Sequence, residues 1–198
     1  PEHYNDFMNN LPLKSYTTRT GKLNLACRLP KEMLKPDLGP KMYSAYGTTK
    51  FPERGTTNLH LDICDAINVM VYVGGASSSN NGSPETREIF DKTIDETHVD
   101  SEMKSQIRNN RLVPGALWHI FKPSDAPKMR GFLNKVADER KISPEKRTDP
   151  IHDQIWYLDQ NLLDRLHKEC GVKSYPILQC MGDAILIPAG APHQVKNL

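Results

Sequence analysis

The sequence predicts a mainly β domain, built as a barrel or jelly roll, that carries helical insertions. Residues 57–73 and 175–195 have the alternation and the short apolar runs of β-strands, separated by turn residues. Most of the chain between these two regions has helical periodicity instead. A regular alternation of strand and helix would indicate a parallel sheet, and the sequence does not have one. Strands that flank a helical middle therefore favour a barrel or jelly roll.

The composition is that of a single globular domain. The chain has 198 residues, of which 37% are hydrophobic and 25% are charged, and it is long enough to bury a core. The formal net charge of +2 does not indicate a whole-surface nucleic-acid binder. No apolar run approaches the ~20 residues of a membrane helix. The four cysteines form no C-x-x-C pair, which predicts free thiols in a reducing compartment. Because the chain begins at Pro1, we expect residues 1–198 to be a single-domain fragment of a longer protein.

The first strands are expected after an irregular segment of residues 1–56. Residues 57–63 alternate apolar with polar side chains, and the polar positions include His60 and Asp62. Residues 68–73 are a mostly apolar run that a pair of glycines ends, which predicts a buried strand.

Residues 76–113 are expected to form a helical insert between core strands. Residues 76–84 have the Ser-, Asn- and Gly-rich composition of a flexible loop, and residues 85–111 have helical character with an acidic beginning. Residues 117–121 then read as a short strand.

Two amphipathic helices follow. In residues 125–142 the apolar side chains fall on one face, after a Ser-Asp pair that is suited to cap the helix. Residues 159–170 have Asp159 as the expected N-cap and Gly171 as the expected stop.

The end of the chain is predicted to be β again. Residues 175–181 and 184–188 are the expected strands, joined by a Gly-Asp turn. A tight Ala-Gly-Ala-Pro turn then leads into a strand that opens with His193.

One pair of polar residues has the spacing of a metal site. Two histidines and a carboxylate on one side of an iron ion leave three positions open for a co-substrate and dioxygen. An H-x-D pair on a strand supplies two of these ligands, because residues i and i+2 face the same way. Three pairs in the sequence match H-x-[DE]: His60 with Asp62, His98 with Asp100, and His167 with Glu169.

Local structure separates the three pairs. The third lies on an expected helix, where two steps turn by about 200° and send the side chains apart, and the second lies in the polar insert. Only His60 and Asp62 lie on a strand with apolar neighbours, and His193 is the suitable third ligand. Two other interpretations stay open at this level: a strand with a solvated face, and a surface turn for His193.

Several blocks of the sequence resemble one family. They resemble the JmjC domain of the histone H3 lysine 9 demethylases, the JHDM2 type of JmjC-domain histone lysine demethylase. The blocks are residues 55–62, 68–74, 114–121, 149–154 and 182–195, and residues 37–43 fit the same group. The resemblance runs from about residue 10 to the end of the chain.

The resemblance implies a double-stranded β-helix, the cupin-like jelly roll of the JmjC fold. It implies that His60, Asp62 and His193 bind iron(II), with 2-oxoglutarate and dioxygen as co-substrates. The implied reaction demethylates mono- or dimethyl-lysine of histone H3, lysine 9 in particular, and releases formaldehyde and succinate. The implied partners are the histone H3 tail and chromatin in the nucleus, with no membrane and with nucleic acid contacted only through the nucleosome.

The resemblance extends to the co-substrate pocket. Thr57 and Asn68 match positions of polar contacts to 2-oxoglutarate, and Trp118 matches an aromatic residue that lines it. The structural alternatives are a β-former at Thr57, a turn residue at Asn68 and a core residue at Trp118. The sequence departs from the family at Ala116, where many JmjC enzymes place a lysine that pairs with the far carboxylate of 2-oxoglutarate. Two other functions stay open: a protein hydroxylase on the same fold, and a non-catalytic JmjC chromatin scaffold.

Overall fold

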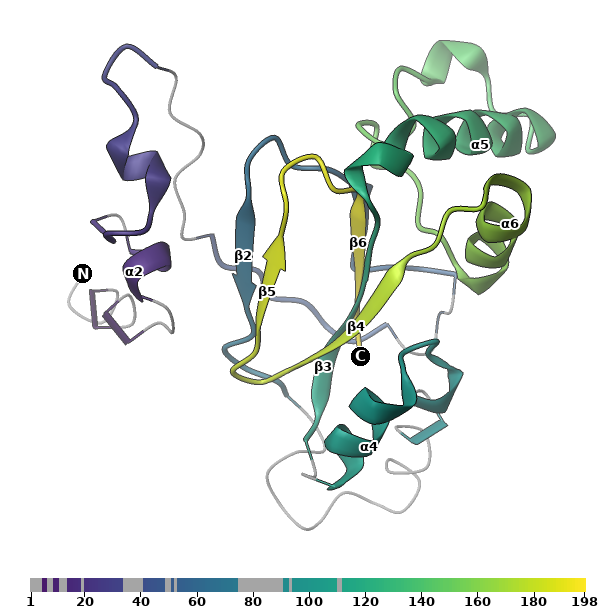
Figure 1. Cartoon of the computed structure of the whole chain (residues 1–198). Helices are drawn as coiled ribbons and strands as arrows, with labels where there is room; N and C mark the ends of the chain where they lie inside the picture. Colours follow the sequence, from purple (N-terminus) through teal and green to yellow (C-terminus); the bar gives the residue numbers. More distant parts are fainter. Residues whose placement is uncertain are drawn as a thin grey trace.

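The structure, a computed structural model, describes residues 5–6, 9–10, 14–18, 20–33, 41–48, 51, 53–74, 91–92, 94–109 and 112–198. The strands are β1 (Thr57–His60), β2 (Ala66–Val69), β3 (Pro114–Ile120), β4 (Tyr175–Cys180), β5 (Ala184–Ile187) and β6 (His193–Asn197). They form two antiparallel sheets, a larger one with the order β1-β6-β3-β4 and a smaller one that pairs β2 with β5 (Figure 1).

The two sheets bury an apolar interior between them. Trp118, Ile120 and Val195 extend from the larger sheet into a cluster that also holds Ile185 and Ile187 of β5. Strand β3 is central, with β4 on one side and β6 on the other, and all seven of its residues are buried. The prediction of a mainly β jelly roll with helical insertions is confirmed.

Two helices form a layer beside the larger sheet (Figure 1). They are α5 (Ala126–Glu139), which follows the 3-10 turn η2 (Pro123–Asp125), and α6 (Gln160–Cys170). The apolar face expected on α5 is buried: Met129, Phe132, Leu133 and Val136. Asp125 stands at the N-cap position, but its side chain makes no capping bond, because the η2 turn already brings the chain into helical conformation there.

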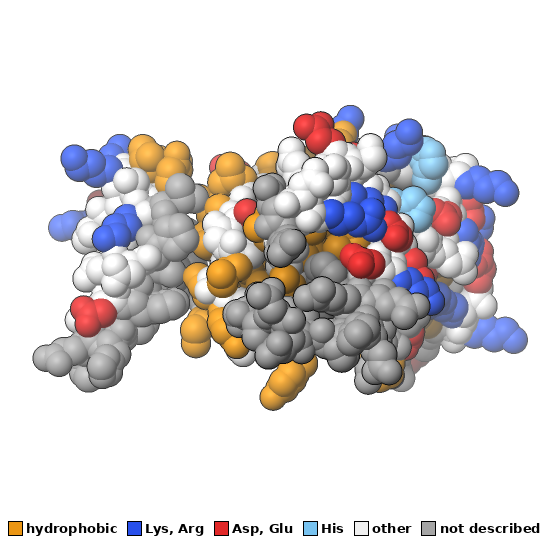
Figure 2. Space-filling view, turned by 90° about the horizontal axis from the view of Figure 1, so that it is seen from below, with side chains coloured by type: hydrophobic (Ala, Val, Ile, Leu, Met, Phe, Trp, Pro, Cys, Tyr) orange, Lys and Arg blue, Asp and Glu red, His pale blue; other side chains and the backbone are white. Residues whose placement is uncertain are grey.

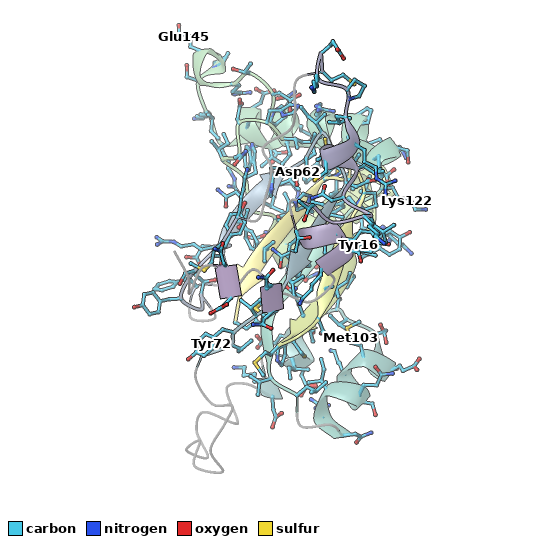
Figure 3. All side chains as sticks on the ribbon, turned by 90° about the vertical axis from the view of Figure 1, so that its left-hand side faces the viewer. Tyr16, Asp62, Tyr72, Met103, Lys122 and Glu145 are labelled. Carbon is cyan, nitrogen blue, oxygen red and sulfur yellow. The ribbon has the colours of Figure 1, made fainter. Side chains whose placement is uncertain are left out.

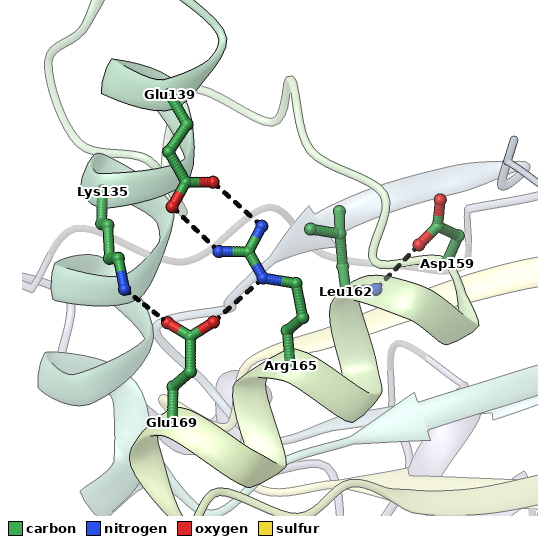
Figure 4. A network of polar contacts seen from close by, with 6 residues as sticks. All are labelled: Lys135, Glu139, Asp159, Leu162, Arg165 and Glu169. Carbon is green, nitrogen blue, oxygen red and sulfur yellow. Dashed lines mark hydrogen bonds and ion pairs between the residues drawn. The ribbon is translucent and has the colours of Figure 1, made fainter.

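Helix α6 has the expected bounds. The Asp159 carboxylate accepts the backbone N–H of Leu162 at 2.9 Å, and Gly171 ends the helix with a left-handed φ of 69°. Arg165 on α6 donates to Glu139 of α5 and to Glu169, a network that also includes Lys135 (Figure 4). These contacts hold the exposed sides of α5 and α6 together while their apolar sides form the core.

Helix α4 (Ser101–Asn109) covers part of the outer face of the larger sheet. Its Ile107 packs in one cluster with Leu117 of β3 and Leu178 of β4. The described part of the expected insert therefore includes a helix that lies outside the space between the sheets. The loop expected at residues 76–84 lies outside the described residues.

The first three strands differ from their predictions. The sequence indicated strands over residues 57–63 and 117–121, whereas β1 ends at His60, so that Asp62 lies just beyond it, and β3 spans Pro114–Ile120. The sequence indicated residues 68–73, whereas β2 ends at Val69, which pairs with Ala184 at the start of β5. The next residue, Met70, exchanges backbone hydrogen bonds with the 182–183 turn. The apolar run continues beyond β2, but the ladder stops because β5 has only four residues to pair with it.

The remaining short elements lie at the periphery. They are α2 (Lys14–Thr17), the 3-10 turn η1 (Leu25–Arg28) and the 3-10 turn η3 (Pro144–Lys146). Seen from below, hydrophobic side chains gather in the middle of the molecule, and charged side chains cover the side of the helices (Figure 2). No helix in the described ranges is both long and apolar enough to cross a membrane.

Asp62 lies toward one end of the sheets, beside the turn that leads into β6. Figure 3 places Asp62 and Lys122 toward one end, and Tyr72 and Met103 toward the other. At the Asp62 end, the backbone N–H of Gly190 donates to Asp62 O at 2.8 Å, so the segment after β1 meets the turn before β6.

Candidate metal centre

The structure brings together the three residues that the sequence singled out. Strands β1 and β6 are antiparallel neighbours, and His60 lies directly across from His193. Their ring centroids are 4.2 Å apart, and the His193 Nε2 lies 3.7 Å from a carboxylate oxygen of Asp62. One potential ligand atom from each residue lies within 4.8 Å of the other two. Among the described residues, this is the group of histidine and carboxylate side chains that is close enough to hold a metal ion.

Both imidazoles are oriented by the backbone. The Nδ1 of His60 lies 2.8 Å from Asn58 O, and the Nδ1 of His193 lies 2.9 Å from Ala191 O. A carbonyl oxygen can only accept, so Nδ1 carries the proton in each ring and Nε2 keeps its lone pair for a metal. Burial lowers the pKa of His193, which favours the neutral form that metal binding requires.

A tight turn aims His193 at the other two residues. The N–H of Ala191 donates to Pro188 O at 3.1 Å, and Gly190 has a φ of 72°, as a type II turn requires at its third position. The Asp65 carboxylate accepts the N–H of Ala189 in this turn at 2.7 Å. Asp65 was not among the predicted site residues, and only its place three residues after Asp62 could have drawn attention to it.

The donor set fits iron(II). Two neutral imidazoles and one carboxylate are the ligands of a facial triad, which leaves coordination positions open on the far side of the ion. The side chain of Asp62 is 44% exposed whereas that of His193 is 4% exposed, so the group is open toward the Asp62 side. Space for further ligands is therefore expected on that side.

A β-bulge explains how Thr57 relates to His60. Thr57 lies across from Val195, and His60 lies across from His193. Between these two pairs β1 advances by three residues and β6 by two, so β1 contains one extra residue. Because His193 and Val195 share a face of β6, Thr57 and His60 also share it, although they are three residues apart. The bulge turns Leu59 into the helical core, where it is fully buried.

Trp118 and Asn68 are joined through a residue that sequence reasoning missed. The Trp118 indole N–H donates to Gln179 Oε1 at 2.8 Å, and Gln179 Nε2 lies 3.2 Å from Asn68 Oδ1. Trp118 also stacks beside His193, with ring centroids 6.1 Å apart. The turn alternative for Asn68 is wrong, since it lies within β2, whereas Trp118 is both a core residue and a neighbour of the triad. The only signal for Gln179 is an amide in an otherwise apolar run.

Ala116 lies on the same face of β3 as Trp118 and is buried. Its partner across the ladder on β4 is Gln179. The nearby Lys196 belongs to the opposite face of β6, and its Nζ donates to Phe51 O at 2.8 Å. Lys196 therefore does not replace the lysine that the family resemblance led us to expect at position 116.

The chain belongs to the JmjC domain family. Residues 91–198 match the family described as "JmjC domain, hydroxylase", a match that includes His193.

Curated relatives extend the similarity to the whole chain. It is 51% identical over 198 residues to "Lysine-specific demethylase 3" of Drosophila melanogaster and 50% identical over 200 residues to "Lysine-specific demethylase 3A" of Homo sapiens. It is 42% identical over 199 residues to "Probable JmjC domain-containing histone demethylation protein 2C" of Homo sapiens. All of this chain is covered in each comparison, but it spans only 23%, 15% and 8% of these relatives, respectively.

Proposed function

We propose that this chain is the catalytic domain of an iron(II)- and 2-oxoglutarate-dependent oxygenase that demethylates mono- and dimethyl-lysine of histone H3, with lysine 9 as the target. The observation that carries the proposal is the convergence of His60, Asp62 and His193 in a JmjC jelly roll. The relatives named as lysine-specific demethylases, which match all of the chain, support the substrate class.

His60, Asp62 and His193 would hold the iron. Bound iron(II) supplies the oxidation of an N-methyl group by dioxygen, while 2-oxoglutarate is converted to succinate and carbon dioxide. The resulting N-hydroxymethyl group breaks its C–N bond, which releases formaldehyde and leaves the amine with one methyl group fewer. The chain contributes binding and orientation: the backbone carbonyls fix the two imidazoles, and the Asp62 carboxylate offsets the charge of the ion.

Thr57, Asn68 and Trp118 would form the co-substrate pocket. The Thr57 hydroxyl and the Asn68 amide are donors suited to the carboxylates of 2-oxoglutarate. Trp118 would line the pocket beside His193, where its ring limits the access of water.

The histone H3 tail and chromatin are the proposed partners, and the nucleus is the proposed location. Both follow from the relatives' names, which concern lysine demethylation and histone demethylation. We also propose that residues 1–198 form one catalytic domain fragment, with residues 76–113 as an insert between core strands. The packing of α4 on the outside of the larger sheet supports the position of this insert.

Formaldehyde release tests the proposed activity. The full-length protein with iron(II), 2-oxoglutarate and oxygen should release formaldehyde from a histone H3 tail peptide that carries dimethyl-lysine 9. His60→Ala should abolish the release, and His152→Ala, at an exposed histidine outside the triad, should leave it unchanged. Equal release by wild type and His60→Ala would contradict the role of the triad.

A protein hydroxylase on the same fold is the second candidate, and the family description as a hydroxylase favours it. Mass spectrometry of the reaction separates the two activities. A side chain that gains one oxygen without loss of a methyl group would establish hydroxylation, whereas loss of the methyl group establishes demethylation.

A further inference from the structure

A buried glutamine connects the two sheets at the candidate co-substrate pocket. Gln179 lies on β4, is fully buried, and reaches Trp118 on β3 and Asn68 on β2. Its Nε2 lies 3.2 Å from each of three acceptors: Asn68 Oδ1, Asn68 O and Asp183 O. Both ends of this amide are therefore hydrogen-bonded, as a buried polar group requires.

The hydrogen bonds of Gln179 have a defined direction. The indole N–H of Trp118 can only donate, so the end of Gln179 that faces it must be the oxygen. The opposite end must then be the NH₂ group. The backbone carbonyls of Asn68 and Asp183 face that end and can only accept, so they require the same orientation of the amide. This polarity does not depend on how the amide atoms are assigned, because one neighbour is a pure donor and two are pure acceptors.

The direction continues into Asn68. An NH₂ group of Gln179 faces the Asn68 side chain, so the atom of Asn68 on that side must be its oxygen. The NH₂ group of Asn68 consequently points away from Gln179. A carboxylate can be bound by an NH₂ group and is repelled by an amide oxygen, so the polarity decides whether Asn68 can bind 2-oxoglutarate.

We propose that Gln179 is a positioning residue that holds Asn68 with its NH₂ group toward 2-oxoglutarate and fixes the Trp118 ring beside it. This inference rests on the proposed function, because it assigns a role within the same pocket. Ala116, the ladder partner of Gln179, does not supply the cation that many JmjC enzymes place at this position. The orientation of a neutral donor such as Asn68 therefore bears directly on the proposed binding.

A double-mutant cycle tests this role through 2-oxoglutarate binding. Calorimetry without oxygen would measure the dissociation constant of 2-oxoglutarate for the full chain loaded with iron(II). Gln179→Leu should raise this constant by about tenfold, the effect of one hydrogen bond to a charged group. In an Asn68→Ala background the same substitution should change it by less than about twofold, because Gln179 acts through Asn68.

The indole proton of Trp118 gives a second readout that requires neither iron nor activity. The chain has two tryptophans, so NMR resolves two indole N–H signals. The Trp118 signal should exchange slowly with solvent in wild type and quickly in Gln179→Leu.

Gln194→Leu is the matched control. Gln194 is an equally buried glutamine whose amide binds the backbone of Leu158, so its contacts are to the helical layer. The control should lower the melting temperature but leave both the 2-oxoglutarate constant and the Trp118 exchange within about twofold of wild type. If Gln179→Leu does not fold, Gln179→Met, with an unbranched side chain of similar length, replaces it.

The possible outcomes separate the inference from the proposed function. Wild-type protein that binds iron but not 2-oxoglutarate would overturn both. Wild type that binds 2-oxoglutarate no better than Gln179→Leu would overturn the inference alone. Full additivity in the cycle would also overturn it, because it would show that Gln179 does not act through Asn68.

Discussion

His119 makes the stability of this fold depend on pH. Its side chain lies on β3, is 5% exposed, and has an Nδ1 atom without a hydrogen-bond partner among the described residues. Burial, with a smaller contribution from the nearby His98, lowers the pKa of His119 from 6.5 to about 4. His119 therefore stays neutral in the folded protein over a range in which the unfolded chain takes up a proton.

The size of the effect follows from these two values. Between pH 6.5 and about 4 the unfolded chain binds more protons than the folded chain, so the free energy of unfolding rises with pH in that window. The contribution is fully present above pH 6.5 and is lost as the pH falls toward 4. A pKa difference of about 2.5 corresponds to about 3 kcal/mol over the whole window, of which about 2 kcal/mol is lost between pH 7 and pH 5.

Replacement of His119 by phenylalanine removes the ionisable ring and keeps its approximate size. Urea unfolding at pH 7 and pH 5 should show that wild type loses about 2 kcal/mol more than His119→Phe over this range. Between pH 7 and pH 8 the two proteins should respond alike. Equal losses between pH 7 and pH 5 would refute the argument that burial keeps His119 neutral.

Three further predictions concern the centre and its support. Asp65→Ala removes the acceptor for the Ala189 N–H, so it should weaken iron(II) binding about tenfold in a metal titration. Unchanged affinity would show that the hydrogen bond between Asp65 and Ala189 does not orient His193. Thr57→Val should raise the KM for 2-oxoglutarate by about tenfold with a smaller change in kcat, because it removes the hydroxyl proposed to donate to a carboxylate. An unchanged KM would exclude Thr57 from the pocket. Leu133→Ala, in the fully buried core between α5 and α6, should cost about 3 kcal/mol in urea unfolding, and a loss below about 1 kcal/mol would contradict the packing.

Local signals in the sequence predicted the parts of the fold that depend on local interactions. Helix α6 has the expected bounds because Asp159 and Gly171 cap it from within its own segment. The end of β2 was wrong because the length of its partner β5, more than 100 residues later, decides where the ladder stops.

The features of the candidate centre also separate into those set by local sequence and those set by distant contacts. The H-x-D spacing of His60 and Asp62 is a local pattern, and the turn before His193 has recognisable turn residues. The bulge that brings Thr57 to the same face arises from pairing with β6, which the sequence does not display. Gln179 has no motif at all, since its role depends on contacts with Asn68, 111 residues away.

Iron binding by the triad decides whether His60, Asp62 and His193 form a metal centre. The measurement is the amount of iron(II) bound by the purified full-length protein without oxygen, for wild type, Asp62→Ala and Asp100→Ala. Asp100 is the matched control because it belongs to a second H-x-D pair and caps α4 through the N–H of Met103, outside the centre. We expect about one iron per chain for wild type and Asp100→Ala and none for Asp62→Ala, because two imidazoles alone do not complete the ligand set. Iron bound equally well by Asp62→Ala would show that Asp62 is not a ligand of the metal.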